Sequence, residues 1–220
     1  VLLSLEESNI KTIKDLKNKT LRSSSSLNSA EFKLLLLNNN MKIDEINIIK
    51  NTGNIDDLIN KKTDVVFSYM SNEPYYLEKR GIKYNTISLK TKGFDFYSDI
   101  LFTTGKEIEK NPKRAARFLQ ASLKGWNYAF NNIEETVNLI YLKYNLQNKS
   151  KEALRFEAKQ LKKLAFYDTS KLGEISIKKM QRISDINKIM GQIEEDFDIN
   201  NYIYSRINAD LTEEEKKFIA

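Results

Sequence analysis

The chain of 220 residues contains no cysteine and no histidine. Without cysteine it has no disulfide, no thiolate metal ligand and no cysteine nucleophile, although this absence fits a reducing and an oxidising compartment equally well. Without histidine it lacks the usual general base, the commonest zinc ligand and every arrangement of the Ser-His-Asp type. Any chemistry would depend on Asp, Glu, Lys and Tyr, and we expect neither a metal site nor a cofactor.

Long apolar runs are also missing. The richest run, residues 32–37, is broken by Lys33 and is followed by three asparagines, so it falls short of the roughly 18 apolar residues of a membrane span. A hydrophobic content of 40% with 30% charged residues fits one or two soluble, compact domains. The start, Val1-Leu2-Leu3-Ser4-Leu5, has neither an initiator Met nor the pattern of a secretion signal, and we interpret it as an interior cut.

The net charge of +6 does not indicate a nucleic-acid partner. Lysines alternate with acidic residues along most of the chain, and the densest basic stretch, residues 106–117, includes Glu107 and Glu109. This stretch lies on an expected helix, where such a mixture is typical of a solvated face.

The first half alternates between strand and helix patterns. Strand patterns occur at residues 1–5, after a short helix at 13–16, and at 46–50 and 64–69, with helix patterns at 29–38 and 55–60. The order strand, helix, strand, helix, strand predicts an α/β fold with a parallel sheet.

The second half differs in kind, because it becomes helical after two further expected strands at residues 84–89 and 100–104. Asn111-Pro112 opens a long helix, and three more helical patterns follow at 133–144, 150–165 and 175–190. The apolar face of the first long helix consists of Ala115, Phe118, Leu119, Ser122, Leu123, Trp126 and Ala129. We expect Trp126 to be a core residue on this face.

Polar and aromatic side chains gather where expected strands end, which is where open α/β sheets bind small molecules. A serine run follows one strand, Met70-Ser71-Asn72-Glu73-Pro74-Tyr75-Tyr76 follows another, and a Gly-Phe-Asp-Phe-Tyr stretch begins at residue 93. The candidate ligand-binding residues are Ser23, Ser24, Ser25, Ser26, Tyr69, Asn72, Glu73, Tyr76, Phe94, Asp95 and Tyr97.

Each candidate also has a structural interpretation. The serines can be a solvated turn that caps a helix, or they can direct hydroxyl and backbone N–H groups at an anionic or polar ligand. Glu73 and Asn72 can bind an amino or ammonium group, or simply cap the helix that starts at Pro74. The aromatic rings can stack on a ligand or pack in the core, with at least half of them expected in the core. Asp95 can face a cation or form a turn, and for Asp99 we favour the turn.

Four stretches of the chain together carry a resemblance: residues 64–82, Gly-Phe-Asp-Phe-Tyr at 93–97, Ile-Leu-Phe-Thr at 100–103, and Ala-Ser-Leu-Lys-Gly-Trp-Asn-Tyr-Ala at 121–129. They are similar to the thiamine-precursor-binding group of bilobed solute-binding proteins, the NMT1/THI5-like family. Residues 10–20 also resemble the stretch that opens the second lobe in such proteins, so the likeness covers residues 1–193.

The resemblance implies a truncated bilobed fold of the type II periplasmic-binding-protein kind, a parallel-sheet lobe followed by a helical region. It implies a second lobe at residues 12–83, hinge crossings and the helical remainder of the first lobe at 1–11 and 84–196, and a linker to a following module at 197–220. About ninety first-lobe residues would precede Val1 in a complete member. The helical half must then repack, dimerise or expose apolar surface.

The function expected from the resemblance is non-catalytic binding of a small polar or heteroaromatic solute, such as a thiamine-type pyrimidine, outside the cytoplasm. The last fourteen residues resemble a linker in membrane receptors, so we expect a sensor domain that is tethered to the membrane in a longer protein. Two alternatives stay open: the solute-binding subunit of an ABC importer, and a protein-interaction domain with a vestigial cleft. Fungal relatives that are enzymes use a histidine and cysteines, which this chain lacks.

Overall fold

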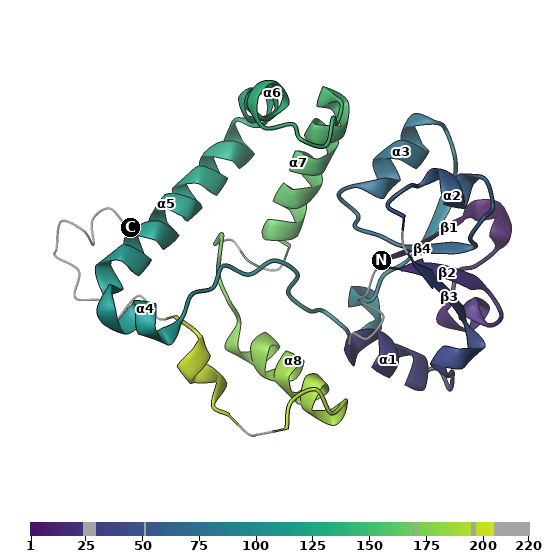
Figure 1. Cartoon of the computed structure of the whole chain (residues 1–220), viewed down its shortest axis with the longest axis horizontal. Helices are drawn as coiled ribbons and strands as arrows, with labels where there is room; N and C mark the ends of the chain where they lie inside the picture. Colours follow the sequence, from purple (N-terminus) through teal and green to yellow (C-terminus); the bar gives the residue numbers. More distant parts are fainter. Residues whose placement is uncertain (24–29, 51, 168, 170, 195–196, 205–220) are drawn as a thin grey trace.

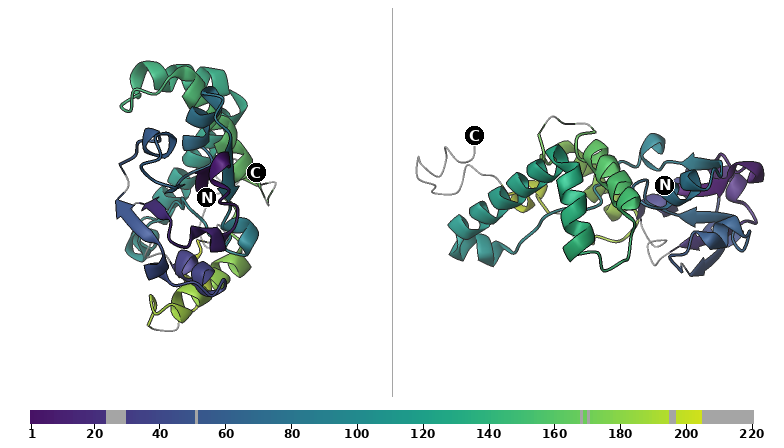
Figure 2. Two further views of the ribbon diagram at one scale, coloured as in Figure 1. Left: turned by 90° about the vertical axis from the view of Figure 1, so that its right-hand side faces the viewer. Right: turned by 90° about the horizontal axis from the view of Figure 1, so that it is seen from above.

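The computed structural model describes residues 1–23, 30–50, 52–167, 169, 171–194 and 197–204. An α/β lobe lies at one end of the molecule, and a group of helices extends away from it along the long axis (Figures 1 and 2). The strands are β1 (Leu2–Leu5), β2 (Thr20–Ser23), β3 (Asn47–Lys50), β4 (Val65–Phe67) and β5 (Tyr84–Ile87). The helices are α1 (Ala30–Leu37), α2 (Asp56–Ile59), α3 (Glu73–Lys79), α4 (Gly105–Lys110), α5 (Pro112–Asn131), α6 (Ile133–Lys143), α7 (Lys151–Ala165) and α8 (Ile177–Ile189). Short 3-10 turns are η1 (Glu6–Ser8), η2 (Ile13–Leu16), η4 (Ile43–Glu45), η5 (Lys90–Lys92) and η6 (Ile199–Tyr202).

The five strands form one sheet in the order β3-β2-β4-β1-β5. Strand β2 pairs parallel with β3 and with β4, as the alternating pattern predicts. Strand β1 is antiparallel to both of its neighbours, β4 and β5, and this reversal is not contained in the alternation of strand and helix. The α/β fold class is confirmed, with β1 inserted against the common direction of the sheet.

Both faces of the sheet are covered, because successive strand residues point to opposite sides. Leu2, Leu21 and Val65 belong to a core that also contains Phe32 of α1 and Ile186 of α8. Leu3 and Val66 belong to a second core, which includes Leu58 of α2 and Leu77 of α3. Helix α8 therefore packs on the α/β lobe although it lies almost a hundred residues further along the chain.

The helical part consists of α4 to α7, and α4, α5 and α7 begin with local signals. Thr104 Oγ1 accepts a hydrogen bond from the N–H of Glu107, and Ser150 Oγ accepts one from the N–H of Ala153. Pro112 stands in the first turn of α5, where its missing N–H costs nothing. Phe130 anchors the group, since its ring contacts those of Trp126 and Phe166.

The expected strand at residues 100–104 is wrong. Within the described part of the chain these residues form no strand, and they run from the α/β lobe to α4 as an extended crossing (Figure 1). A β pattern needs a neighbouring strand to satisfy its backbone groups, and the sheet of the lobe ends at β5 on this side. Phe102 is consequently 87% exposed.

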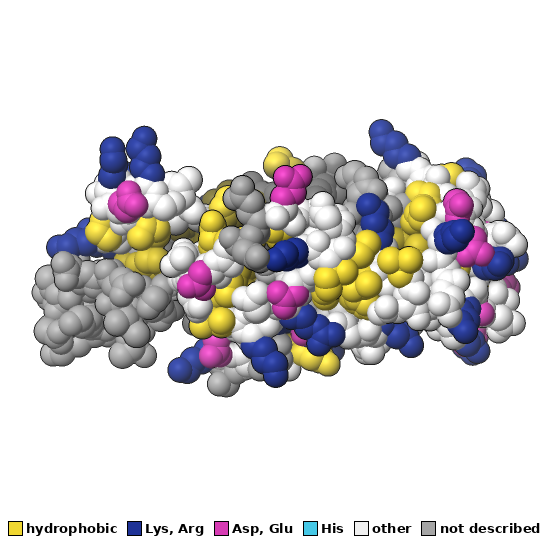
Figure 3. Space-filling model, turned by 90° about the horizontal axis from the view of Figure 1, so that it is seen from below, with side chains coloured by type: hydrophobic (Ala, Val, Ile, Leu, Met, Phe, Trp, Pro, Cys, Tyr) yellow, Lys and Arg dark blue, Asp and Glu magenta, His cyan; other side chains and the backbone are white. Residues whose placement is uncertain are grey.

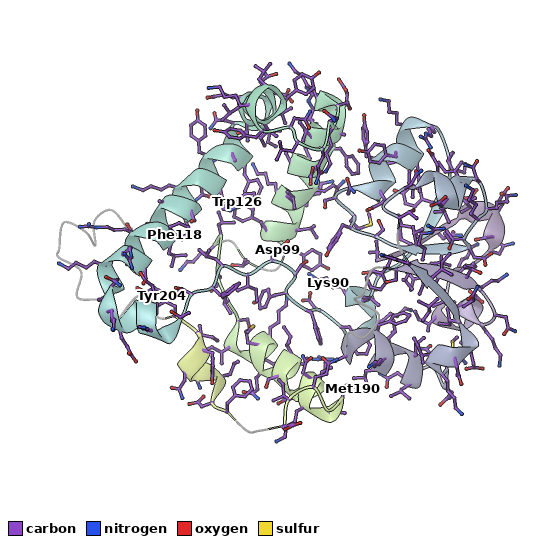
Figure 4. All side chains as sticks on the ribbon, viewed as in Figure 1. Lys90, Asp99, Phe118, Trp126, Met190 and Tyr204 are labelled. Carbon is purple, nitrogen blue, oxygen red and sulfur yellow. The ribbon has the colours of Figure 1, made fainter. Side chains whose placement is uncertain are left out.

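The expectation that Trp126 is a core residue is also wrong, because its side chain is 50% exposed. Phe118, two turns earlier on α5, is 62% exposed. Both lie on the side of α5 that faces α7 and α8 (Figure 4), and hydrophobic side chains reach the surface at several places on the face shown in Figure 3. Of the three outcomes considered for the helical half, which were repacking, dimerisation and exposed apolar surface, the described residues show exposed apolar surface.

None of the helices in the described residues combines the length and the apolar character that a membrane span requires.

Candidate functional site

The carboxyl ends of β2, β3 and β4 meet at one edge of the sheet, because these strands are parallel. Ser23 is the last residue of β2, and Ser68 and Ser71 follow β4. All three serines are buried. The sheet therefore collects hydroxyl groups at the edge where such folds bind ligands.

Glu73 organises the loop after β4. One carboxylate oxygen accepts hydrogen bonds from Ser68 Oγ at 2.7 Å and from the backbone N–H of Tyr69 at 3.2 Å. The other accepts one from Asn72 Nδ2 at 3.1 Å. Both oxygens are thus used within the loop. The side chain of Asn72 makes no capping hydrogen bond to α3, so these contacts brace the loop and differ from the helix cap considered for the two residues. Their contact with a ligand stays a prediction.

Tyr69 and Tyr76 flank this loop in different environments. Tyr69 is 67% exposed, so its ring is accessible at the sheet edge. Tyr76 is half-buried against the second core and meets the ring of Tyr75 edge-on at 5.1 Å. Tyr69 is the better placed of the two for stacking on a solute.

The stretch 93–97 does not present all of its predicted residues to solvent. Phe94 is only 6% exposed and belongs to the first core. The carboxylate of Asp95 pairs with Lys90 at 3.3 Å and with Lys179 at 2.9 Å, and the Tyr97 hydroxyl accepts a hydrogen bond from the N–H of Ser176 at 2.9 Å. These contacts join the stretch to η5 and α8. Ser24, Ser25 and Ser26 lie outside the described residues.

Arg22 is a residue that the sequence interpretation missed. It is buried next to Ser23, and its guanidinium contacts Asp57 Oδ2 at 2.9 Å and Thr52 Oγ1 at 2.9 Å. The hydroxyl of Thr52 first, and then the charges of Arg22 and Lys62, lower the pKa of Asp57. This ion pair ties β2 to α2 directly beneath the strand ends. The signal in the sequence that could have identified Arg22 is its position as a charged residue directly before the serine run.

The described residues contain no group of three or more Asp, Glu, His or Cys side chains that could hold a metal ion.

Comparison with known proteins places the chain in a family. Residues 1–136 match the family described as NMT1/THI5 like. The chain belongs to the NMT1/THI5-like family. No curated protein sequence matches the chain.

Solved structures of the same fold include two sulfonate-binding proteins. The periplasmic aliphatic sulphonate binding protein SsuA from Escherichia coli is 16% identical, with a TM-score of 0.62 over 93% of this chain and 65% of its own. The alkanesulfonate-binding protein SsuA from Xanthomonas axonopodis pv. citri, bound to MOPS, is 11% identical, with a TM-score of 0.58 over 88% of this chain and 65% of its own. The desulfurization enzyme DSZB is 9% identical, with a TM-score of 0.57 over 93% of this chain and 73% of its own.

These likenesses confirm the periplasmic-binding-protein-like fold expected from the sequence. The chain spans slightly less than two thirds of the length of either sulfonate-binding protein.

Proposed function

We propose that this chain forms part of a non-catalytic, extracytoplasmic domain that binds a small solute at the carboxyl ends of β2 and β4. The observation that carries the proposal is the meeting of buried Ser23, Ser68 and Ser71 with the exposed ring of Tyr69 at one sheet edge. The Ser68 hydroxyl already donates to Glu73, so the proposal relies on Ser23 and Ser71, whose hydroxyl groups suit a polar or anionic group. An aromatic ring suits the apolar part of the same solute.

The solute class that we favour is a small organic sulfonate. Two solved structures of this fold are named as sulfonate-binding proteins, and one of them holds MOPS. A thiamine-type pyrimidine remains the second candidate, because the chain belongs to the NMT1/THI5-like family.

The importer role has more support than the receptor role. Two of the three similar structures are named as binding proteins, one of them periplasmic, and the last fourteen residues, which resemble a receptor linker, lie outside the described residues. We therefore propose a solute-binding protein that serves an importer, and the sensor domain becomes the alternative. Attachment to a membrane would depend on other parts of a longer protein.

A thermal-shift screen tests solute binding, with alkanesulfonates, aryl sulfinates, aminopyrimidines and short carboxylates as probes. A bound probe at 100 times its Kd stabilises the folded state by about 2.7 kcal/mol. Glu73→Gln should weaken the shift, because one of the two carboxylate oxygens that accept from Ser68, Tyr69 and Asn72 is replaced by an NH2 donor. Glu78→Gln is the matched control, since this carboxylate on the same helix accepts only from the Tyr84 hydroxyl among its described hydrogen bonds.

The domain proposal is that residues 12–83 form the second lobe, that 1–11 and 84–196 contain the crossings and the helical remainder of the first lobe, and that 197–220 form a linker. The exposed crossing at 100–104 and the exposed face of α5 support it, since a sheet that paired with the crossing would cover Phe102, Phe118 and Trp126.

The fluorescence of Trp126 tests the domain proposal, because the chain has one tryptophan. In this chain we expect ready quenching by acrylamide, as the side chain is half exposed. In a longer form that includes residues before Val1 we expect a blue-shifted, protected tryptophan. Equal quenching in both forms would contradict the domain proposal. Protection that depends on protein concentration would instead indicate a homodimer, and no response to any probe in the longer form would favour a protein-interaction domain.

A further inference from the structure

Two crossings connect the α/β lobe to the helical part, and both meet the lobe at one cluster of side chains. The first crossing runs from β5 to α4, over residues 88–104, and the second runs from α7 to α8, over residues 166–176. Lys90, Asp95 and Tyr97 come from the first crossing, Tyr167 comes from the second, and Lys179 lies in the first turn of α8. We call these five residues the crossing clamp.

Asp95 is the centre of the crossing clamp. Its two oxygens receive different lysines, Lys90 on Oδ1 at 3.3 Å and Lys179 on Oδ2 at 2.9 Å. The Lys179 ammonium also lies 4.3 Å from the ring centroid of Tyr97, whose hydroxyl accepts the N–H of Ser176 at 2.9 Å. The first crossing is thereby fastened to the start of α8.

Helix α8 packs on the α/β lobe, so its first turn is held against the lobe. Ile186 of this helix and Phe94, the residue before Asp95, are both buried in the first core. One contact of the crossing clamp reaches the helical part instead: Lys90 lies 3.2 Å from the ring centroid of Tyr167, just after α7. A cation over a ring face imposes less direction than a hydrogen bond, so this contact tolerates rotation.

On the helical side the second crossing is held at Gly173. A Cβ atom at this position would lie 2.7 Å from Leu123 Cδ2 of α5, so the crossing runs closely against that helix. The segments between the fixed points are residues 98–104 of the first crossing and 174–175 of the second. Asp99, at the start of the first segment, is exposed and lies between the two parts of the molecule (Figure 4).

We propose that Asp95 is a positioning residue that fastens the first crossing to the start of α8, which packs on the α/β lobe, so that movement between the two parts bends residues 98–104 and 174–175. The purpose of such a hinge rests on the proposed function, in which the domain closes on a solute. The clamp itself is tested without a solute. Direct contact of Asp95 with a ligand stays a prediction.

The effect of removing the carboxylate follows from the charges. Asp95→Asn takes away the anion that both lysines share at a partly buried site, where charges are screened less than in open water. Asp95→Glu retains the charge and should restore part of the clamp.

Hydrogen exchange at the amide of Ser176 is the direct measurement, because this N–H donates to Tyr97. In Asp95→Asn we expect its exchange to be about fivefold faster, the change that corresponds to the loss of a partly exposed ion pair. Glu107→Gln is the matched control: its partner Arg114 lies within the helical part, and its side chain is similarly exposed. It should leave the Ser176 amide unchanged.

A distance measurement tests the hinge itself. Since the chain has no cysteine, Lys14→Cys in the lobe and Lys143→Cys on α6, both exposed, can carry a pair of spin labels. We expect a broader distance distribution in Asp95→Asn than in the parent, and partial recovery in Asp95→Glu. Molar salt should broaden the parent distribution towards that of Asp95→Asn. An unchanged amide and an unchanged distribution in Asp95→Asn, or the same changes in Glu107→Gln, would overturn the proposal.

Discussion

The α/β lobe and the helical part use apolar residues at similar regular spacing, but only the lobe buries most of them. In the lobe, Phe32 of α1 is fully buried because the sheet offers it a complementary surface. In the helical part, Phe118 of α5 remains largely exposed because no sheet lies beneath it in the described structure. An amphipathic pattern thus specifies which face of a helix is apolar, but it does not specify which other segment covers that face.

The largest expected difference between the two regions comes from truncating one phenylalanine in each. Phe32→Ala should lower the free energy of unfolding by about 3–5 kcal/mol, because it empties a buried site. Phe118→Ala should change it by less than about 1 kcal/mol, since the ring is already mostly in water. Urea denaturation of the full chain measures both. Similar losses would mean that α5 has a covering partner in solution.

A smaller difference is expected at two glycines with positive φ. Gly81 has φ +66° and open space around it, whereas Gly173 has φ +74° and lies against Leu123. Alanine at either position should cost about 1–2 kcal/mol for the left-handed backbone. Gly173→Ala should cost more than Gly81→Ala, because a methyl group must also displace the leucine. Equal losses in denaturation would show that Leu123 moves freely and that the helical part is loosely packed there.

A smaller effect still is expected where the two regions touch at α3 and α7. The Tyr75 hydroxyl lies 3.2 Å from Ser150 Oγ, and its ring centroid lies 5.7 Å from that of Phe156. Tyr75→Phe keeps the ring contact and removes the hydrogen bond, which should cost about 0.5–1.5 kcal/mol. Because Ser150 also caps α7, a double-mutant cycle with Ser150→Ala is needed to isolate the contact. A coupling energy of zero would mean that the contact between Tyr75 and Ser150 does not stabilise the structure.

The subtlest comparison concerns one tyrosine in each region. Burial, and then a hydrogen bond to Glu78, raise the pKa of Tyr84 to about 12, while a hydrogen bond to Glu135 is the main cause that raises the pKa of Tyr128. The stability that Tyr84 contributes should be complete below its ordinary pKa of 10.0 and disappear as the pH rises towards 12. In a pH titration followed by ultraviolet absorbance, Tyr84→Phe should lack the tyrosine that ionises at the highest pH. Loss of that phase in Tyr128→Phe instead would reverse the assignment.

Much of the lobe could be predicted from the sequence, because its strands and helices carry local periodicity and turn signals. The strand before Ser68 and the helix that begins near Pro74 are examples. The sheet edge at the strand ends could be predicted, and the candidate site at that edge stays a prediction, but the contacts between its residues could not be predicted. Neither the engagement of Glu73 with Ser68 nor that of Asp95 with Lys179 follows from spacing, since the first is a loop geometry and the second joins residues 84 positions apart.

Most helices and strands of the lobe, the absence of cysteine and histidine chemistry, and the membership of the NMT1/THI5-like family follow from the sequence alone. The tertiary structure decided the reversed direction of β1, the burial of Phe94, the exposure of Trp126 and the unpaired state of residues 100–104. The physical reason is the same in each case. Backbone periodicity is local, whereas burial and strand pairing depend on which distant segments are present to supply a partner.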